Sequence, residues 1–363
     1  MNLKCGIVGL PNVGKSTLFN ALSNGGAEAA NFPFCTIDPN VGLVPVPDER
    51  LDTLSDIVES AQKIPAVIEF VDIAGLVKGA SEGKGKGNAF LSHIREVDLI
   101  VHVVRCFDDD DIIHVEGDVN PERDIRIIED ELILKDLESV EKRSANLFRQ
   151  AKGDKSVKAQ YDIVERLREH LEEGNSARTF DATADEKEAY RDLFLLSSKD
   201  VLYACNVGEE DLNTGNAYVD SVKKVASVHN DEIVMFCAKI EAEIAELDDE
   251  EKEMFLEELG VESGGLDRLI RGAYAELGLI TYFTAGPKES RAWTITKGMK
   301  APQAAGVIHT DFEKGFIRAE TIAYSDYVEL GSEKAAKEAG KMRQEGKEYV
   351  VADGDVMLFR FNV

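Results

Sequence analysis

The stretch "GLPNVGKST" at residues 9–17 decides the fold of this chain. The apolar run "LKCGIVGL" (3–10) leads into it and predicts a β-strand, and "STLFNALS" (16–23) follows with the spacing of an amphipathic helix. A glycine, four further residues and then Gly-Lys-Ser form the phosphate-binding loop, or P-loop, that joins such a strand to such a helix. The stretch therefore predicts an α/β fold around a mostly parallel sheet.

Each residue type in the loop has a chemical reason. Gly9 and Gly14 let backbone N–H groups wrap around phosphates, and the N-terminus of the following helix adds positive potential. We expect Lys15 to reach the terminal phosphates and the Ser16 hydroxyl to ligate Mg²⁺. A chance glycine-rich turn is a poor alternative, because it does not explain the lysine, the hydroxyl and the strand-to-helix context together.

The next parts of a nucleotide switch follow in order along the chain. "AVIEFVDIAGL" (66–76) predicts a buried strand that ends at Asp72 and Gly75. Asp72 is expected to hold the water shell of Mg²⁺, and the Gly75 N–H to face the γ-phosphate. Between the P-loop and this strand, Thr36 lies in the proline-rich segment 31–40. It is a candidate Mg²⁺ ligand that closes over a triphosphate.

The motif expected to read the base comes late. "DLIVHVVRCF" (98–107) predicts a buried parallel strand, but the motif appears only after the strand-like "VLYAC" (201–205), as Asn206-Val207-Gly208-Glu209. Then "EIVMFCAKI" (232–240) provides Ala238, whose backbone N–H is expected near the base.

The base motif indicates adenine. In guanine readers the motif is Asn-Lys-x-Asp, but here Val207 replaces the lysine and Glu209 is one methylene longer than aspartate. Discrimination by buried hydrogen bonds needs correctly placed groups. Asn206 is expected to bridge the N6/N7 edge of adenine, and Val207 to offer apolar surface and a backbone group. The sequence therefore predicts ATP in preference to GTP.

The usual water-positioning glutamine is missing. Leu76 stands where it is expected, so we predict slow intrinsic hydrolysis. Two substitutes are available. Asn12 is expected to help hold a monovalent cation such as K⁺ near the β- and γ-phosphates, in part replacing an arginine finger. His114, in the acidic loop "DDDDIIHVEGDVNP" (108–121), is a candidate catalytic group, and the alternative is a loop histidine without a catalytic role.

Composition limits the class of protein. The chain has 363 residues, enough for two or three domains, with 44% hydrophobic and 31% charged residues. No apolar run reaches the length of a membrane span, so we expect a cytoplasmic protein without a membrane partner. The formal charge of −27 argues against binding DNA through its phosphates. Five cysteines without a CxxC pair disfavour zinc sites and disulfides.

Three parts are predicted along the chain. Residues 1–120 and 201–280 form the nucleotide-binding domain, and 121–200 form an inserted antiparallel helical hairpin, either purely structural or a partner-binding arm. Residues 281–363 alternate short strands with one helix from Pro302, and end in a hairpin around Asp353-Gly354.

Several of these segments together resemble one family over essentially the whole chain. They are "GLPNVGKST", "FPFCTIDPN" (32–40), "DIAGLVKGA" (72–80), the Asn-x-x-Glu base motif and the C-terminal "TAGPKESRAWTITKG" (284–298), "QAAGVIHTDFEKGFIRAE" (303–320) and "GKEYVVADGDVMLFRF" (346–361). The chain is similar to the YchF subfamily of Obg-related P-loop NTPases.

The resemblance implies a P-loop ATPase with a coiled-coil insert, a C-terminal ubiquitin-like (TGS) α+β domain and association with ribosomes or RNA. It also implies site residues. Phosphate contacts fall on the loop from Asn12 through Val13 to Thr17, Mg²⁺ is bound by Ser16 and Thr36, and Val207 touches adenine through its backbone.

The leading interpretation is a regulatory ATPase whose hydrolysis gates release of a ribosomal or RNA partner. The alternatives are a GTP-dependent switch, a small-molecule kinase, and a nucleotide-gated binding protein whose hydrolysis is incidental. A kinase needs an acceptor pocket and a lid, whereas Thr36 and the Asp72–Gly75 motif favour switch segments.

Overall fold

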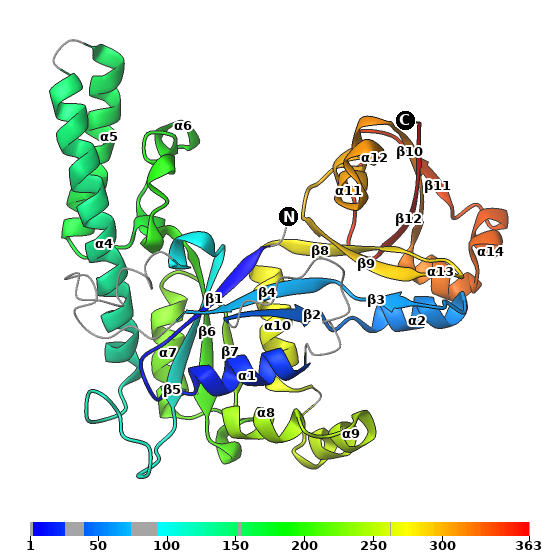
Figure 1. Ribbon diagram of the computed structural model, residues 1–363, viewed down its shortest axis with the longest axis horizontal. Helices are drawn as coiled ribbons and strands as arrows, with labels where there is room; N and C mark the ends of the chain where they lie inside the picture. Colours follow the sequence, from blue (N-terminus) through cyan, green and yellow to red (C-terminus); the bar gives the residue numbers. More distant parts are fainter. Residues whose placement is uncertain (1–2, 26–39, 74–92, 152–153, 262, 363) are drawn as a thin grey trace.

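The computed structural model describes residues 3–25, 40–73, 93–151, 154–261 and 263–362. Within them the chain forms two sheets and a projecting pair of helices, α4 and α5 (Figure 1). The helical pair extends from one side of the first sheet, and the second sheet lies on the other side of the molecule. The predicted α/β class is confirmed.

The first sheet has the strand order β2-β4-β1-β5-β6-β7. Its strands span β1 Lys4–Val8, β2 Val41–Pro45, β4 Val67–Asp72, β5 Leu99–Cys106, β6 Asp200–Val207 and β7 Ile233–Phe236. All neighbours are parallel except β2, which runs antiparallel to β4. Every residue of β5 is buried, as expected for a strand covered on both faces. The mostly parallel sheet is therefore as predicted.

Helices flank this sheet. They are α1 Lys15–Gly25, α7 Ala217–Ser227, α8 Ala238–Ile244 and α10 Gly265–Glu276, with α9 Asp249–Glu258 following α8. α2 Glu49–Ile57 lies instead beside the second sheet (Figure 1). α1 lies beside α8, and α10 packs against β6 and β7 (Figure 1). Both α1 and α8 begin directly after a strand of the sheet, so their N-termini lie at the edge where parallel strands end.

The inserted hairpin, called the arm below, consists of α4 (Pro121–Gln150) and α5 (Lys155–Glu172). Asn120 caps α4, since its side-chain oxygen accepts the Arg123 N–H at 3.1 Å. After α5 the chain turns at Gly174, which has φ +79°, a left-handed conformation that glycine adopts easily. Apolar side chains from both helices share one cluster: Ile133, Val140, Leu147, Val164, Leu167 and Leu171. The predicted antiparallel hairpin is confirmed.

The chain returns from the arm to the sheet through short helices at Ala177–Thr179, α6 Ala184–Lys187, Arg191–Leu193 and Leu196–Ser198. Asp136 on α4 anchors this return. Its carboxylate accepts the N–H groups of Leu196 and Ser197 at 2.8 and 2.7 Å, and the Ser197 hydroxyl at 2.6 Å. Burial raises the pKa of Asp136, and these hydrogen bonds oppose that rise.

The second sheet has the order β11-β10-β12-β8-β9-β3. Its strands span β3 Lys63–Ile64, β8 Leu279–Thr284, β9 Ser290–Thr296, β10 Phe316–Ala323, β11 Arg343–Glu345 and β12 Asp355–Phe361. Four short helices accompany them: α11 Ala301–Ile308, α12 Thr310–Lys314, α13 Tyr324–Leu330 and α14 Glu333–Glu338. The prediction of a single helix here is wrong. Helices α12 to α14 were missed because they are too short to show a clear helical period.

The predicted hairpin around Asp353-Gly354 is also wrong. β12 pairs with β10 and β8, whereas residues 346–352 form only an isolated bridge, between Val350 and Lys300. Asp353 Oδ1 accepts the Thr281 N–H at 2.9 Å, and the Gly354 N–H donates to the Thr281 carbonyl at 2.8 Å. The turn is therefore anchored to β8 instead of closing a two-stranded ribbon.

The two sheets are joined by more than the chain connection. β3, which lies between α2 and β4, belongs to the second sheet, where it pairs with β9. The predicted boundary at residue 281 falls inside β8. Arg50 on α2 adds a side-chain link, since it contacts both Asp48 and Asp353.

Candidate nucleotide-binding site

The P-loop connects β1 to α1 as the motif predicts. Gly14 has φ +97° and Asn12 has φ +64°, both in the left-handed region. A Cβ on Gly9 would stand 2.8 Å from the Val103 carbonyl oxygen, and one on Gly14 would stand 2.3 Å from Asn206 Nδ2. Close packing therefore requires glycine at both positions, and at Gly14 the left-handed backbone requires it as well.

Lys15 and Asp72 meet at this edge of the sheet. β1 and β4 are neighbours with Ile7 opposite Asp72, and the Lys15 ammonium contacts the Asp72 carboxylate. Ser16 and Thr17 follow at the exposed first turn of α1, where backbone N–H groups have no partner within the helix. The predicted phosphate-binding residues therefore lie together around one helix N-terminus.

The side-chain oxygen atoms near Lys15 are suitable ligands for a magnesium ion. The Ser16 hydroxyl and the Asp72 carboxylate offer the oxygen ligands that Mg²⁺ prefers. Thr36, the other predicted ligand, lies outside the described residues, as do Gly75 and Leu76. In the part of the chain that the structure describes, no group of three or more His, Cys, Asp and Glu side chains forms a metal site.

Asn206 joins the P-loop to the base motif. Its Nδ2 donates to the Val13 carbonyl at 3.0 Å and its Oδ1 accepts the Ala238 N–H at 3.0 Å, and the residue is 3% exposed. The amide thus holds the protein's own backbone on both sides, and Asn206 is a positioning residue for these two segments. Its nitrogen keeps a second N–H and its oxygen a second lone pair. The direct adenine contact of Asn206 stays a prediction.

The other two residues of the base motif differ in exposure. Val207 is 1% exposed at the end of β6, opposite Cys106, so the expected apolar surface for the base is not available from its side chain. Glu209 is exposed at the start of the turn Glu209–Asp211. Ala238 begins α8 directly beside the Asn206 amide. A contact from the Val207 backbone stays a prediction.

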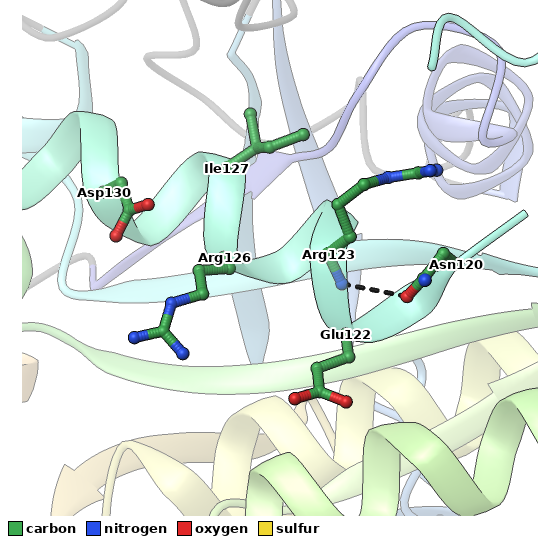
Figure 2. A pocket seen from close by; sticks show the side chains of 6 residues that line it. All are labelled: Asn120, Glu122, Arg123, Arg126, Ile127 and Asp130. Atoms are coloured by element: carbon green, nitrogen blue, oxygen red, sulfur yellow. Dashed lines mark hydrogen bonds between the residues drawn. The ribbon is translucent and has the colours of Figure 1, made fainter. Parts of the chain in front are cut away.

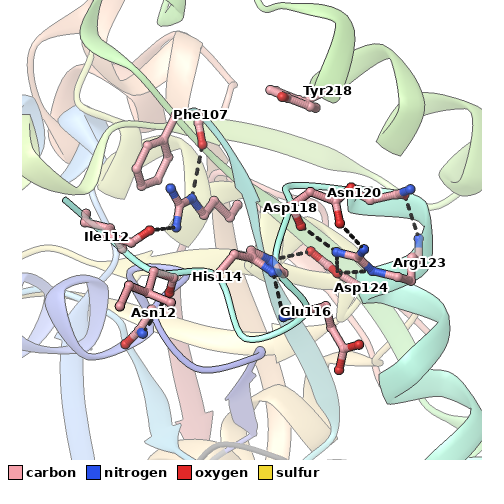
Figure 3. Close-up of polar contacts among 12 residues, drawn as sticks. Asn12, Phe107, Ile112, His114, Glu116, Asp118, Asn120, Arg123, Asp124 and Tyr218 are labelled. Atoms are coloured by element: carbon pink, nitrogen blue, oxygen red, sulfur yellow. Dashed lines mark hydrogen bonds and ion pairs between the residues drawn. The ribbon is translucent and has the colours of Figure 1, made fainter. Parts of the chain in front are cut away.

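His114 lies in the loop that connects β5 to α4, close to the P-loop but turned away from it (Figure 3). Asn12 Nδ2 donates to the Ile113 carbonyl at 3.1 Å. The His114 side chain is only 3% exposed, and its Nε2 lies 2.9 Å from Asp124 Oδ2. The sequence placed His114 in an acidic loop and gave no sign of this buried partner.

Sequence reasoning also missed Arg105. Its guanidinium, 2% exposed, donates to the carbonyls of Phe107, Asp109 and Ile112 at 3.1, 3.2 and 2.8 Å. The signal was present, because an arginine inside the apolar run 98–107 needs internal hydrogen-bond partners. Asp124 had no comparable signal, since acidic residues are common in the first turn of a helix.

Two pockets lie away from the P-loop. One, of about 400 Å³, lies at the base of α4 and is lined by Asn120, Glu122, Arg123, Arg126, Ile127 and Asp130 (Figure 2). The other, of about 500 Å³, lies between the two sheets near Arg50 and Tyr274. Neither contains a predicted nucleotide-binding residue, and the chemistry of the P-loop is the stronger evidence for the site.

Comparison with known proteins decides the family. The "Ribosome-binding ATPase YchF" of Bacillus subtilis (strain 168) is 56% identical over 366 residues, which cover 100% of both chains. The protein of the same name from Escherichia coli O157:H7 is also 56% identical over the full length of both. This chain belongs to the YchF family. The "Obg-like ATPase 1" of Pongo abelii is 49% identical over 99% of this chain and 93% of its own.

Family models and a solved structure agree with this family assignment. Residues 279–362 match the model YchF-GTPase_C, described as a protein of unknown function, and residues 4–143 match a model described as "50S ribosome-binding GTPase". The solved "Structure of the Schizosaccharomyces pombe YchF GTPase" superposes with a TM-score of 0.89 at 43% identity, covering 99% of this chain and 98% of that one. The YchF fold thus extends over nearly the whole chain.

Proposed function

We propose that this YchF-family chain hydrolyses ATP and binds the ribosome. The P-loop with Lys15 beside Asp72 supports a nucleoside triphosphatase, since these are the groups that hold and neutralise a triphosphate. Relatives that match the full chain are named ribosome-binding ATPases. Because ribosomes are the named partner of those relatives, we also propose a cytoplasmic location.

The ATP preference rests on one observation about the base motif. Its asparagine keeps the contacts that shape the site, whereas its guanine-reading positions have changed. Asn206 still holds Val13 and Ala238 together, which shapes the site for any nucleotide. The guanine-reading part has changed, because a buried valine replaces the lysine and an exposed glutamate replaces the aspartate. A site without correctly placed partners for guanine loses the discrimination that such hydrogen bonds give.

Metal ions are part of the proposal. We expect Ser16 and Thr36 to ligate Mg²⁺ and Asp72 to hold its water shell. When bound, Mg²⁺ neutralises charge on the transferring phosphoryl group. Asn12 Nδ2 donates to the Ile113 carbonyl, and the side-chain oxygen of Asn12 is a suitable ligand for K⁺.

His114 is the proposed catalytic group, because Leu76 cannot orient water. An imidazole can hydrogen-bond to an attacking water or take its proton. The buried pairing with Asp124 means that this role requires a change in the position of His114.

A GTP-dependent switch is the second candidate, and one observation favours it. The model that matches residues 4–143 is described as a GTPase, and the solved Schizosaccharomyces pombe relative carries the same word. Phosphate release from ATP and from GTP, measured side by side with purified protein, separates the two. Faster release from ATP supports our proposal, and faster release from GTP overturns it.

Ribosome binding is tested separately by cosedimentation in ATP, in ADP and without nucleotide. We expect the bound fraction to depend on the nucleotide. A variant lacking the basic side chains of Lys84 and Lys86, which lie outside the described residues, tests whether that loop contributes. Equal pelleting in every condition would rule out nucleotide-gated attachment.

A further inference from the structure

The loop between β5 and α4, residues 107–120, is called the bridging loop here because it contacts both the P-loop and the arm (Figure 3). Its first half is held on the nucleotide side. Arg105 donates three hydrogen bonds to its carbonyls, and Asn12 of the P-loop donates to Ile113. Ile113 directly precedes His114 in the chain, so a displacement of the P-loop acts on the residue next to His114.

The second half is held by the first turn of α4. His114 Nε2 lies 2.9 Å from Asp124 Oδ2, and His114 Nδ1 accepts the Glu116 N–H at 3.1 Å. Because Nδ1 accepts, Nε2 carries the proton of a neutral ring and donates to the carboxylate. The side chains of His114 and Asp124 are 3% and 5% exposed. Neither ring nitrogen is available to a water molecule in this position.

Arg123, next to Asp124, reinforces the same contact. Its Nε and Nη2 donate to Asp124 Oδ1 at 3.2 and 3.1 Å, and its Nη1 and Nη2 donate to Asp118 Oδ1 and the Asp118 carbonyl at 2.7 and 2.6 Å. One turn of the arm's long helix thus holds the bridging loop at His114 and at Asp118. A rotation or shift of α4 must move or break these contacts.

We propose that Asp124 is a positioning residue that withholds His114 from the nucleotide site, and that displacement of the arm releases it. The inference rests on the proposed function, in which His114 acts in hydrolysis. The arm projects from the sheet, so a large partner that contacts it can shift α4 at its base (Figure 1). Partner binding and hydrolysis are then coupled through one buried pair.

The test is phosphate release from ATP by the full chain carrying Asp124→Asn, with and without purified ribosomes. The substitution keeps the shape but removes the charge that strengthens the hydrogen bond to His114. We expect turnover without ribosomes to rise about three- to tenfold, because a smaller fraction of molecules then has His114 held at position 124. Stimulation by ribosomes should shrink by a similar factor. The double variant with His114→Ala should lose the rise.

Asp110→Asn is the matched control. Asp110 lies exposed in the same bridging loop, outside the contacts that Arg123 and Asp124 make. We expect its turnover to stay within about twofold of the unsubstituted chain, since exposed surface substitutions change little.

A second readout does not depend on activity. Labelling of His114 by diethyl pyrocarbonate, located by mass spectrometry, should be slow in the unsubstituted chain and faster in Asp124→Asn. Unchanged labelling and turnover in Asp124→Asn, or a loss of turnover, would overturn the inference even if the chain proves to be an ATPase. If no ATP is hydrolysed but labelling rises, the proposed function fails while the withholding contact stands.

Discussion

At the scale of single residues, the amide of Asn206 gives the nucleotide site its shape. It connects the P-loop carbonyl of Val13 to the N–H of Ala238 across the end of the sheet. Gly14 is packed so closely on this amide that no side chain fits there. The P-loop and the two motifs that we predict to lie beside the base are therefore one structural unit.

Asn206→Ala should weaken ATP and GTP binding alike and destabilise the fold. The change leaves the Val13 carbonyl and the Ala238 N–H without their partner, and each buried unpaired group costs about 1–3 kcal/mol. Thermal unfolding and nucleotide titration measure the two effects. Asn213→Ala, which removes an exposed bond to the Leu259 carbonyl, is the control. A loss of affinity confined to ATP, at unchanged stability, would contradict this structural role and favour a direct adenine contact by Asn206.

Much of this site is predictable from residue types. The glycines, Lys15, Ser16 and Asp72 come together because the spacing of the motifs fixes them at the ends of parallel strands. The backbone partners of Asn206 were missed, because a sequence shows an amide but not which groups the fold places beside it. The partner of His114 was missed for the same reason, since Asp124 is held in place only by the packing of α4.

At the scale of elements, the strand β5 carries a titratable side chain inside the sheet. His102 is 3% exposed, and burial lowers its pKa to about 3 from the model-peptide value of 6.5. The folded protein thus keeps this imidazole neutral, while the unfolded chain binds a proton below pH 6.5. Stability rises with pH wherever the unfolded state binds more protons.

The free energy of unfolding should therefore fall as pH decreases from about 6.5, by about 1 kcal/mol per pH unit from His102 alone. Denaturant titrations at pH 7.5, 6.5 and 5.5 would measure it. His102→Leu should reduce the slope, because leucine does not titrate. The same slope in both proteins would show that other groups cause the acid sensitivity.

The arm depends on one buried carboxylate where it rejoins the sheet. Asp136 is 1% exposed and accepts hydrogen bonds from Leu196 and Ser197. Asp136→Ala should destabilise the chain by about 3 kcal/mol, because two buried N–H groups lose their partner. Asp130→Ala, at an exposed position of the same helix, should change little. Equal midpoints of chemical unfolding for the two variants would contradict this role.

The arm was predicted correctly in type and place, since α4 and α5 lie within the predicted segment 121–200 and share one apolar cluster. The C-terminal elements were predicted less well. Short helices such as α12 and α14 span too few residues for a period, and the turn at Asp353-Gly354 depends on contacts with Thr281 that only the fold provides.

At the scale of the whole molecule, the second sheet is attached to the nucleotide-binding part by β3 and Arg50. β3 extends the second sheet, and Arg50 donates to Asp48 and to Asp353, with its guanidinium also over the Phe283 ring at 5.2 Å. β2 and β4 flank this connection in sequence, and β4 ends at Asp72. The second sheet is thus joined to the strand that ends at Asp72, where we propose that Mg²⁺ binds.

Arg50→Ala should loosen this attachment. Hydrogen exchange is expected to speed up in β3, β8 and β9, with a loss of stability of about 1 kcal/mol for a half-exposed ion pair. Lys63→Ala removes an exposed pair with Asp52 in the same region and serves as the control. Unchanged exchange in the second sheet of Arg50→Ala would show that β3 alone maintains the attachment.

The most direct test of the account is the affinity of the purified full chain for ATP and for GTP with Mg²⁺, each titrated under the same conditions. We predict a dissociation constant for ATP at least about tenfold below that for GTP, because Val207 and Glu209 no longer provide the guanine partners. Equal constants, or tighter binding of GTP, would contradict the assignment of this site to ATP.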